Sequence, residues 1–256
     1  NMHEGAIVTA EGCWESDMAS VVKMTWRDNP WFPAELLREM ELDRNTDYDH
    51  YLNVWEGHCL QMLEGVVYAR ELRAAQEGGR ICAVPYEPSV PVDTFWDLGR
   101  TNWTSIWFVQ KVAMQYRMLA YYQANHTDID ADDPLGGVAH FIKEVQRRPY
   151  VYGPHHLPHD AKHKKLGMRF SIEEQIRQGL GPKNVTVVPK LSLSDGLNAA
   201  RMRLPNCFFD EEKCADGLWA LRHYKYKKVD GQFSNEPLHD GEGAVDGADA
   251  FRYFAV

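Results

Sequence analysis

Three strand-like segments in the middle of the chain constrain its fold more than any other feature. Residues 92–98 are largely apolar, and the segments TSIWFVQK at 104–111 and YRMLAYY at 116–122 are rich in aromatic and β-branched residues. Only a few residues separate each segment from the next, which favours pairing of neighbours in an antiparallel meander. The sequence therefore predicts a β-sheet with this meander at its centre.

Helices and shorter strands follow the meander along the chain. We expect, in order, a helix at 136–147, a strand at 150–153, a helix at 171–179, a strand at 185–189, and helices at 194–202, 213–226 and 243–254. Ser171 with Glu174 three residues later is a capping-box signature at the start of one helix. Three antiparallel strands followed by strand–helix units predict an α/β fold of the ribonuclease-H-like type, a mixed β-sheet flanked by helices.

The first part of the chain differs from the rest in charge. Residues 1–57 hold 12 acidic and 4 basic side chains, whereas residues 58–256 hold 25 acidic and 24 basic ones. Its expected elements are strands at 6–9 and 20–26, a helix opened by Pro33 and a helix at 46–60. We therefore expect two parts, residues 1–57 and a larger domain of residues 58–256.

The composition excludes several classes of function. A net charge of −9 argues against a strong autonomous nucleic-acid binder, although it is compatible with an enzyme that receives DNA from a partner. Five cysteines without a CxxC pair argue against a disulfide framework and indicate a reducing cytosol. The sequence has no apolar stretch of bilayer-spanning length, no GxxxxGK[ST] loop for ATP, no GxGxxG and no GxSxG motif.

Three aspartates are the candidate functional residues. Asp97 ends the first strand of the meander, Asp160 follows the strand at 150–153, and Asp249 lies on the final helix. We expect their carboxylates to meet at one end of the sheet, where they would suit a hard cation, Mg or Mn, and phosphodiester cleavage. The alternative for Asp97 is a purely structural aspartate that caps the turn at Gly99.

A fourth aspartate, Asp246, lies one helical turn before Asp249 and so shares a face with it. The opposite face of that helix holds Phe251 and Phe254, which predicts that the helix packs on the core through these two rings. The acidic face is then directed at a defined part of the structure. We expect Asp249 to be the third metal ligand, with Asp246 as the second choice.

Histidines and basic residues surround Asp160. The cluster His155, His156, His159 and His163 admits a zinc site, but no cysteine lies within it, and solvated loop histidines are the alternative. The nearby basic side chains are candidates for phosphate contact: Lys162, Lys164, Lys165 and Arg169.

A second basic cluster comprises Arg222, His223, Lys225, Lys227 and Lys228, alternating with Tyr224 and Tyr226. It could follow a DNA backbone, with Lys225 and Lys227 as contacts. Its alternative is a solvated helix end, where cations are favoured by the helix dipole.

Five segments resemble the C-terminal part of the large terminase subunit of tailed bacteriophages: DNPWFPAELLREM, YLNVWEG, FWDLG, LPHDAKHKKLG and PLHDGEGAVDGADAFRYFA. The resemblance runs from about Asp28 to Val256. It implies an endonuclease domain with a ribonuclease-H-like fold, which cuts concatemeric double-stranded DNA during viral genome packaging. It also implies that residues 1–57 are a remnant of the ATPase side or linker that precedes the nuclease.

The resemblance further implies two divalent cations, Mg or Mn, on Asp97, Asp160 and Asp249. The expected partners are double-stranded DNA and, in the full-length protein, the small terminase subunit and the portal. No association with a membrane is expected. The isolated domain is expected to be a monomer. The expected location is the host bacterial cytoplasm, transiently at the procapsid portal. The chain departs from the family pattern at Asn102, where an acid is common, and at Asp246, where a histidine is common.

Two other functions compete with the nuclease. One is a non-catalytic docking module of the packaging motor, which would use the acidic first part, with Trp31 and Trp55 expected to be exposed, for contacts. The other is a strand-transfer enzyme of the transposase or integrase kind, which would share the fold and the acidic residues.

Overall fold

The computed structural model describes residues 7–10, 13–16, 19–46, 51, 54–57, 65–99, 103–125, 137–163, 169–182, 184–190, 192–229, 232–238 and 243–256. The chain divides into two compact units, residues 1–61 and residues 62–256, and we treat each by itself. No helix within the described residues is long and apolar enough to cross a bilayer.

The first unit contains a small sheet and a helix. Its three antiparallel strands are β1 (Ile7–Ala10), β2 (Cys13–Ser16) and β3 (Ala19–Val22), and its helices are a short 3-10 helix (Trp26–Asp28) and α1 (Ala34–Thr46). Strand β2 was not expected, and the strand predicted at 20–26 ends at Val22. The helix expected at 46–60 falls mainly on residues outside those described.

A small aromatic core holds this unit together. Trp55 is only 9% exposed, and its indole nitrogen donates a hydrogen bond to Asp43 at 2.8 Å. Phe32 packs edge-on against Trp55 with 5.7 Å between ring centroids. Trp31, in contrast, is 84% exposed. The expectation that both tryptophans are exposed is therefore wrong for Trp55.

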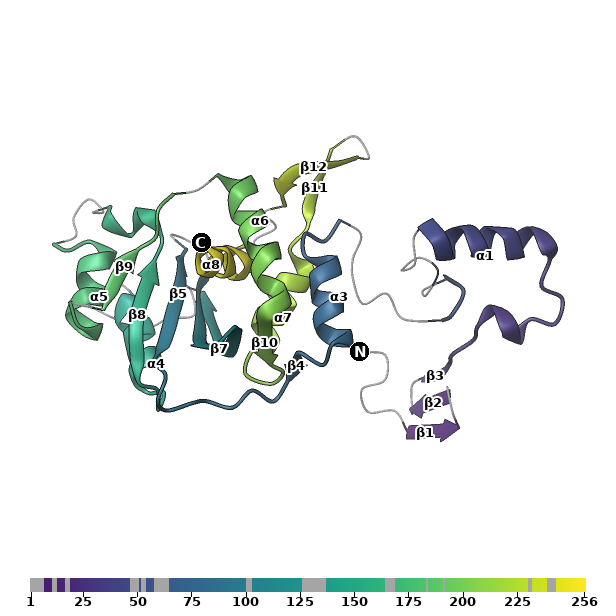
Figure 1. Ribbon diagram of the computed structural model, residues 1–256, viewed down its shortest axis with the longest axis horizontal. Helices are drawn as coiled ribbons and strands as arrows, with labels where there is room; N and C mark the ends of the chain where they lie inside the picture. Colours follow the sequence, from purple (N-terminus) through teal and green to yellow (C-terminus); the bar gives the residue numbers. More distant parts are fainter. Residues whose placement is uncertain are drawn as a thin grey trace. The chain divides into compact units, whose positions relative to one another are not determined.

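The second unit is built on a seven-stranded sheet (Figure 1). Its strands are β4 (Ile81–Cys82), β5 (Val92–Leu98), β6 (Trp103–Val112), β7 (Gln115–Asn125), β8 (Tyr152–Leu157), β9 (Val185–Val187) and β10 (Cys207–Asp210), in the spatial order β4-β10-β7-β6-β5-β8-β9. Strands β5, β6 and β7 are antiparallel, which confirms the meander. The four other strands add in parallel, β8 and β9 beyond β5, and β10 and β4 beyond β7.

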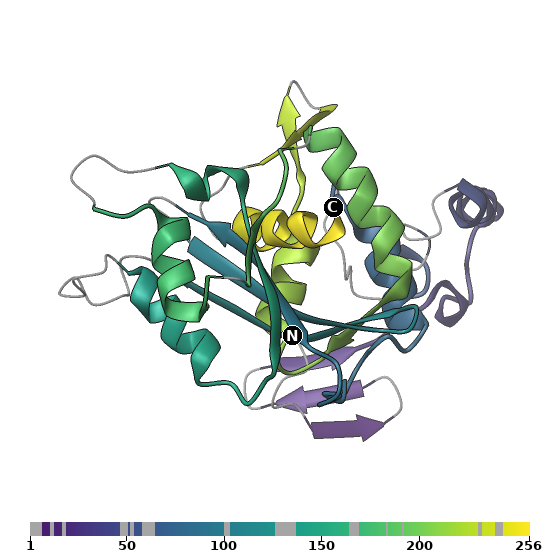
Figure 2. The same ribbon diagram turned by 60° about the vertical axis from the view of Figure 1, so that its left-hand side comes forward.

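Helices cover both faces of this sheet (Figure 2). They are α3 (Ala69–Glu77), α4 (Val138–Gln146), α5 (Ile172–Leu180), α6 (Leu193–Arg203), α7 (Ala215–His223) and α8 (Ala244–Ala255), with 3-10 turns at His159–Lys162 and Leu204–Asn206. Because side chains alternate along a strand, the meander supplies two cores. Trp96 and Phe108 pack toward α4 and α5, whereas Phe95 and Trp107 pack toward α6, α7 and α8. The predicted mixed sheet flanked by helices is confirmed.

Three strands of this unit were missed. Strand β10 has four residues, too few for a periodic pattern. It forms a strand because it pairs in parallel with β7. The helix expected at 213–226 ends at His223, and the chain continues into a hairpin of β11 (Tyr226–Val229) and β12 (Gln232–Pro237). The alternation of lysine and tyrosine from Tyr224 onward was the overlooked strand signal.

Candidate metal centre

The parallel pair β5 and β8 brings two of the predicted aspartates to one edge of the sheet. Asp97 is the last residue but one of β5, and Asp160 lies in the 3-10 turn that follows β8. The strands are neighbours in register, with Phe95 opposite His156. Since parallel strands end at the same edge, the residues after each of them lie close together.

Asp97 faces the side of the sheet that α8 covers. Phe95, two residues earlier, packs edge-on against Phe254 of α8 with 5.3 Å between ring centroids. Side chains two apart on a strand share a face, so Asp97 points to α8 as well. The turn after it requires glycine, since a Cβ on Gly99 would lie 2.1 Å from the carbonyl oxygen of Trp103.

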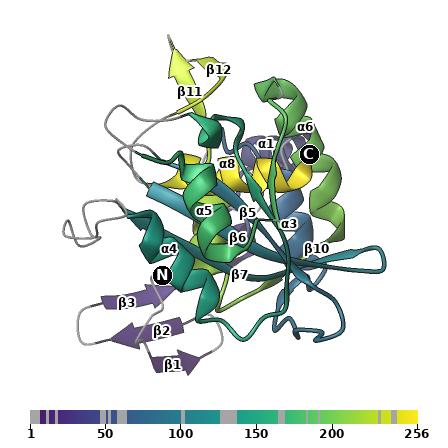
Figure 3. The same ribbon diagram turned by 90° about the vertical axis from the view of Figure 1, so that its left-hand side faces the viewer.

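Helix α8 packs on β5 and β6 of the sheet (Figure 3), and a hydrogen bond ties its first turn to β6. The indole nitrogen of Trp107 donates a 2.9 Å hydrogen bond to the carbonyl oxygen of Gly247. Phe251 is 0% exposed and packs against Trp107 and Phe209. The docking predicted from Phe251 and Phe254 is confirmed, and it carries the acidic face of α8 toward Asp97.

Asp97 lies within electrostatic reach of the three other aspartates. Burial raises the pKa of Asp97 well above its usual range, and the carboxylates of Asp249, Asp246 and Asp160 raise it further, in that order. The guanidinium of Arg252 acts in the opposite direction. Like charges collected at the edge of a sheet are costly unless a cation joins them.

Arg252 is a member of the site that we did not predict. Its guanidinium lies 3.1 Å from a carboxylate oxygen of Asp249, and both side chains are mostly buried. Helix α6 makes room for it at Gly196, where a Cβ would lie 2.5 Å from Cδ of Arg252. The spacing of Asp249 and Arg252, three residues apart on one helix, was the available sequence signal.

The donor set fits a hard divalent cation. All four candidate ligands are carboxylates, the oxygen donors that Mg and Mn prefer. In the conformation seen, no three acidic, histidine or cysteine side chains of the described residues are arranged to hold a metal ion. A cation would therefore have to draw the carboxylates inward, and the assignment of Asp97, Asp160, Asp246 and Asp249 as ligands stays a prediction.

The histidines near Asp160 do not gather into one site. His155 is buried with its Nδ1 2.7 Å from the hydroxyl of Thr94, and burial lowers its pKa to about 4. His156 points to the other face of β8 and stacks on Phe95 at 4.4 Å. His163 is exposed. The described part of the chain holds no zinc cluster, so the zinc alternative is not supported.

The basic candidates fall into two places. Lys162 and Arg169 are exposed near Asp160, while Lys164 and Lys165 lie outside the described residues. Lys227 is exposed on β11 and Lys225 is half-buried just before it. The second cluster is therefore divided: Arg222 and His223 end α7, whereas Lys227 and Lys228 lie on the hairpin. Its interpretation as a helix end is wrong beyond His223.

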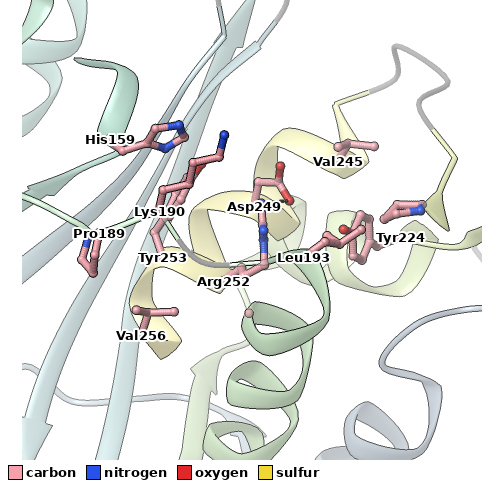
Figure 4. Close-up of a pocket in the computed structure, with 12 residues that line it drawn as sticks. His159, Pro189, Lys190, Leu193, Tyr224, Val245, Asp249, Arg252, Tyr253 and Val256 are labelled. Carbon is pink, nitrogen blue, oxygen red and sulfur yellow. Dashed lines mark ion pairs between the residues drawn. The ribbon is translucent and has the colours of Figure 1, made fainter. Parts of the chain in front are cut away.

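A pocket of about 290 Å³ opens beside the acidic cluster (Figure 4). It was not predicted from the sequence, since its wall combines segments that are far apart along the chain. Its lining residues are His159, Pro189, Lys190, Leu193, Gly196, Tyr224, Pro237, Val245, Asp249, Arg252, Tyr253 and Val256. Asp249 thus belongs both to the acidic cluster and to the pocket wall.

No family model matches this chain. Among solved structures, it is similar to the large terminase of a thermophilic bacteriophage. One crystal form of that terminase gives a TM-score of 0.54 at 14% identity, covering 90% of this chain and 53% of the terminase. Its ADP complex gives 0.53 at 14% identity, covering 91% and 54%. The chain has the fold of part of a phage large terminase.

The chain spans about half the length of the terminases that it matches. A weaker similarity, with a TM-score of 0.47 at 16% identity, relates 75% of this chain to 98% of the large terminase nuclease of thermophilic phage G20c, crystallised with cobalt. The predicted resemblance to large terminases, and with it the ribonuclease-H-like fold, is confirmed at the level of the fold.

Proposed function

We propose that residues 62–256 are a metal-dependent endonuclease of phage genome packaging that cuts concatemeric double-stranded DNA by two-metal phosphodiester hydrolysis. The proposal is supported by the geometry of the sheet edge, where Asp97 at the end of β5 lies beside the turn with Asp160 and under α8 with Asp246 and Asp249. Burial and these three carboxylates raise the pKa of Asp97. The terminase fold supports the same function. The first unit would then be a remnant of the ATPase side or linker.

In this proposal Asp97 contacts both ions, and Asp160 and Asp249 each complete one site, with Asp246 beside them. Two divalent ions held there would activate a water molecule and stabilise the departing oxygen. Arg252 keeps the Asp249 carboxylate in place through their 3.1 Å ion pair. Lys162, exposed two residues after Asp160, would neutralise charge on the DNA backbone.

The proposed setting follows from the same fold. The full-length protein would act on double-stranded DNA in the host bacterial cytoplasm and work with a small terminase subunit and a portal at the procapsid. The isolated chain would be a monomer.

Cleavage of supercoiled plasmid tests this function. We expect nicked and linear products in Mn or Mg, and none in EDTA, because carboxylates alone cannot stabilise the departing oxygen. Calorimetric titration of Mn should show specific binding to the metal-free protein. A protein that cleaves fully in EDTA, or binds no Mn and cleaves nothing, would contradict the nuclease and favour the docking module. Joining of a DNA acceptor to the product would instead indicate strand transfer.

The β11–β12 hairpin supplies a separate prediction about DNA binding. Changing Lys225 and Lys227 together to glutamate should weaken binding of double-stranded DNA in EDTA. It should also flatten the dependence of log K on log salt by about 1 for each lysine that contacts a phosphate. Fluorescence anisotropy across a salt series measures both quantities.

The control is Lys111→Glu, and it is compared with Lys225→Glu and Lys227→Glu made singly, so that each variant changes the net charge by the same amount. Lys111 is exposed near the end of β6, at the opposite edge of the sheet from Asp97. If this control weakens binding as much as each single hairpin variant does, the effect is one of net charge, and the hairpin is no DNA contact.

A further inference from the structure

Three polar groups in the wall of the pocket beside the acidic cluster are buried without a hydrogen-bond partner in the described part of the chain. Tyr224 is 1% exposed, and its hydroxyl has no hydrogen-bond partner among the described residues. The same holds for the buried Nδ1 of His159 and the Nε of Arg252. Buried polar groups without partners are costly, and the Tyr224 hydroxyl and the Arg252 Nε–H are donors, so their presence in one pocket points to a ligand that accepts hydrogen bonds.

The charge of the lining favours an anion. Lys190 is exposed at the pocket, and Arg252 adds a second permanent positive charge. The carboxylate in the lining, that of Asp249, is already ion-paired with Arg252. In Figure 4 Lys190 and His159 lie on the same side of the pocket, which offers a phosphate two neighbouring cationic or donor groups.

The rest of the lining is apolar and aromatic, which a bare phosphate would leave uncovered. Leu193, Val245 and Val256 contribute aliphatic surface, and Tyr253 contributes a ring. A volume of about 290 Å³ lies at the lower end of the ~300–1,000 Å³ typical of small-molecule sites. These properties fit a ligand with one phosphate and one flat ring system, since nucleobases stack on aromatic side chains.

Tyr253 joins the pocket to the acidic cluster. Its ring lines the pocket, and its pKa is raised by burial and by the charges of Asp97 and Asp249. A ligand in the pocket therefore lies next to the carboxylates that we assign to the metals. A strand whose phosphodiester bond meets those carboxylates would place a neighbouring nucleotide at the pocket.

We propose that this pocket binds one nucleotide of the DNA strand beside the cleaved bond, with its phosphate at Lys190 and its base or sugar against Tyr253 and Leu193. This assignment rests on the proposed nuclease function. Binding of this nucleotide sets the position of the DNA strand along its own length relative to the carboxylates. The buried hydroxyl of Tyr224 donates a hydrogen bond to the bound nucleotide.

Binding in EDTA separates this site from cleavage. A fluorescein-labelled short single-stranded oligonucleotide is titrated with the full chain, and deoxyadenosine monophosphate is titrated by calorimetry. Lys190→Glu should weaken oligonucleotide binding by about tenfold at low salt. Tyr224→Phe should weaken it severalfold, since it removes only the hydroxyl and keeps the ring that stacks on Tyr68 at 5.8 Å. Lys143→Glu, an exposed lysine on α4 across the sheet, should bind as the parent does.

The outcomes distinguish this proposal from the nuclease itself. If the parent cleaves plasmid in Mn but both pocket variants bind the oligonucleotide as the parent does, the pocket assignment is overturned and the nuclease stands. If the parent never cleaves but the two variants lose binding, the pocket stands as a nucleotide site, while the nuclease and the position beside a cleaved bond are both overturned. If the two variants weaken binding of deoxyadenosine monophosphate but not of the oligonucleotide, the ligand is a free nucleotide and the strand assignment is overturned.

Discussion

Replacing Asp97 by asparagine should reduce Mn- or Mg-dependent DNA cleavage by at least about a thousandfold while the fold stays intact. Asparagine has the same shape but lacks the charge that would hold a cation between Asp160 and Asp249. Plasmid cleavage rates measure the loss, and far-ultraviolet circular dichroism checks the fold. The control is Glu212→Gln, which removes an exposed carboxylate from the turn before α7. An Asp97→Asn variant with parental activity would remove Asp97 from the mechanism.

The same variant should alter stability in the metal-free state. The folded-state pKa of Asp97 lies above that of the unfolded chain, so the folded protein holds this proton more tightly. Stability from this group is therefore present at low pH and is lost as the pH rises from the unfolded pKa through the folded one. In EDTA the parent should lose free energy of unfolding over that range relative to Asp97→Asn. Parallel pH profiles for the two proteins would contradict the placement of Asp97 among like charges.

Phe251→Ala should lower the free energy of unfolding by about 3–5 kcal/mol, as expected when a large ring is removed from a closed core. Phe251 contacts Trp107 of the sheet and Tyr68 at the start of α3, so its loss leaves a cavity under α8. Chemical denaturation measures the change. Cleavage should fall as well, because the docking of α8 positions Asp249.

Met202→Ala is the matched control for that substitution. Met202 lies on α6, on the same side of the sheet, but is 78% exposed, so its truncation should change stability by less than about 0.5 kcal/mol. Equal losses in the two variants would mean that α8 is not held by the Phe251 contact.

The elements that sequence patterns predicted well are those whose pattern is local. The meander from Val92 to Asn125 is dense in aromatic and β-branched residues, and its hairpins are short. Helix α5 begins after Ser171 with the capping box that its sequence contains. Strand β10 carries no such signal, because its four residues form a strand only once β7 and β4 lie on either side.

The residues of the candidate site also differ in whether a local sequence pattern indicates them. Asp97 could be placed from the end of its own strand, and Asp249 from the apolar face opposite it on α8. Lys190 could not, because its relevance depends on α6, α8 and the turn after β8 meeting around one pocket. Burial of Trp55 was missed for the same reason, since its partner Phe32 lies far from it along the chain.

The hydrogen bond from Trp107 to Gly247 fixes the first turn of α8 on the sheet. Gly247 lies between Asp246 and Asp249, so a tilt of the helix about this point displaces those two carboxylates least. The same tilt moves the far end most, where Tyr253 and Val256 line the pocket. A small tilt of α8 about this contact would therefore change the pocket wall more than the positions of Asp246 and Asp249.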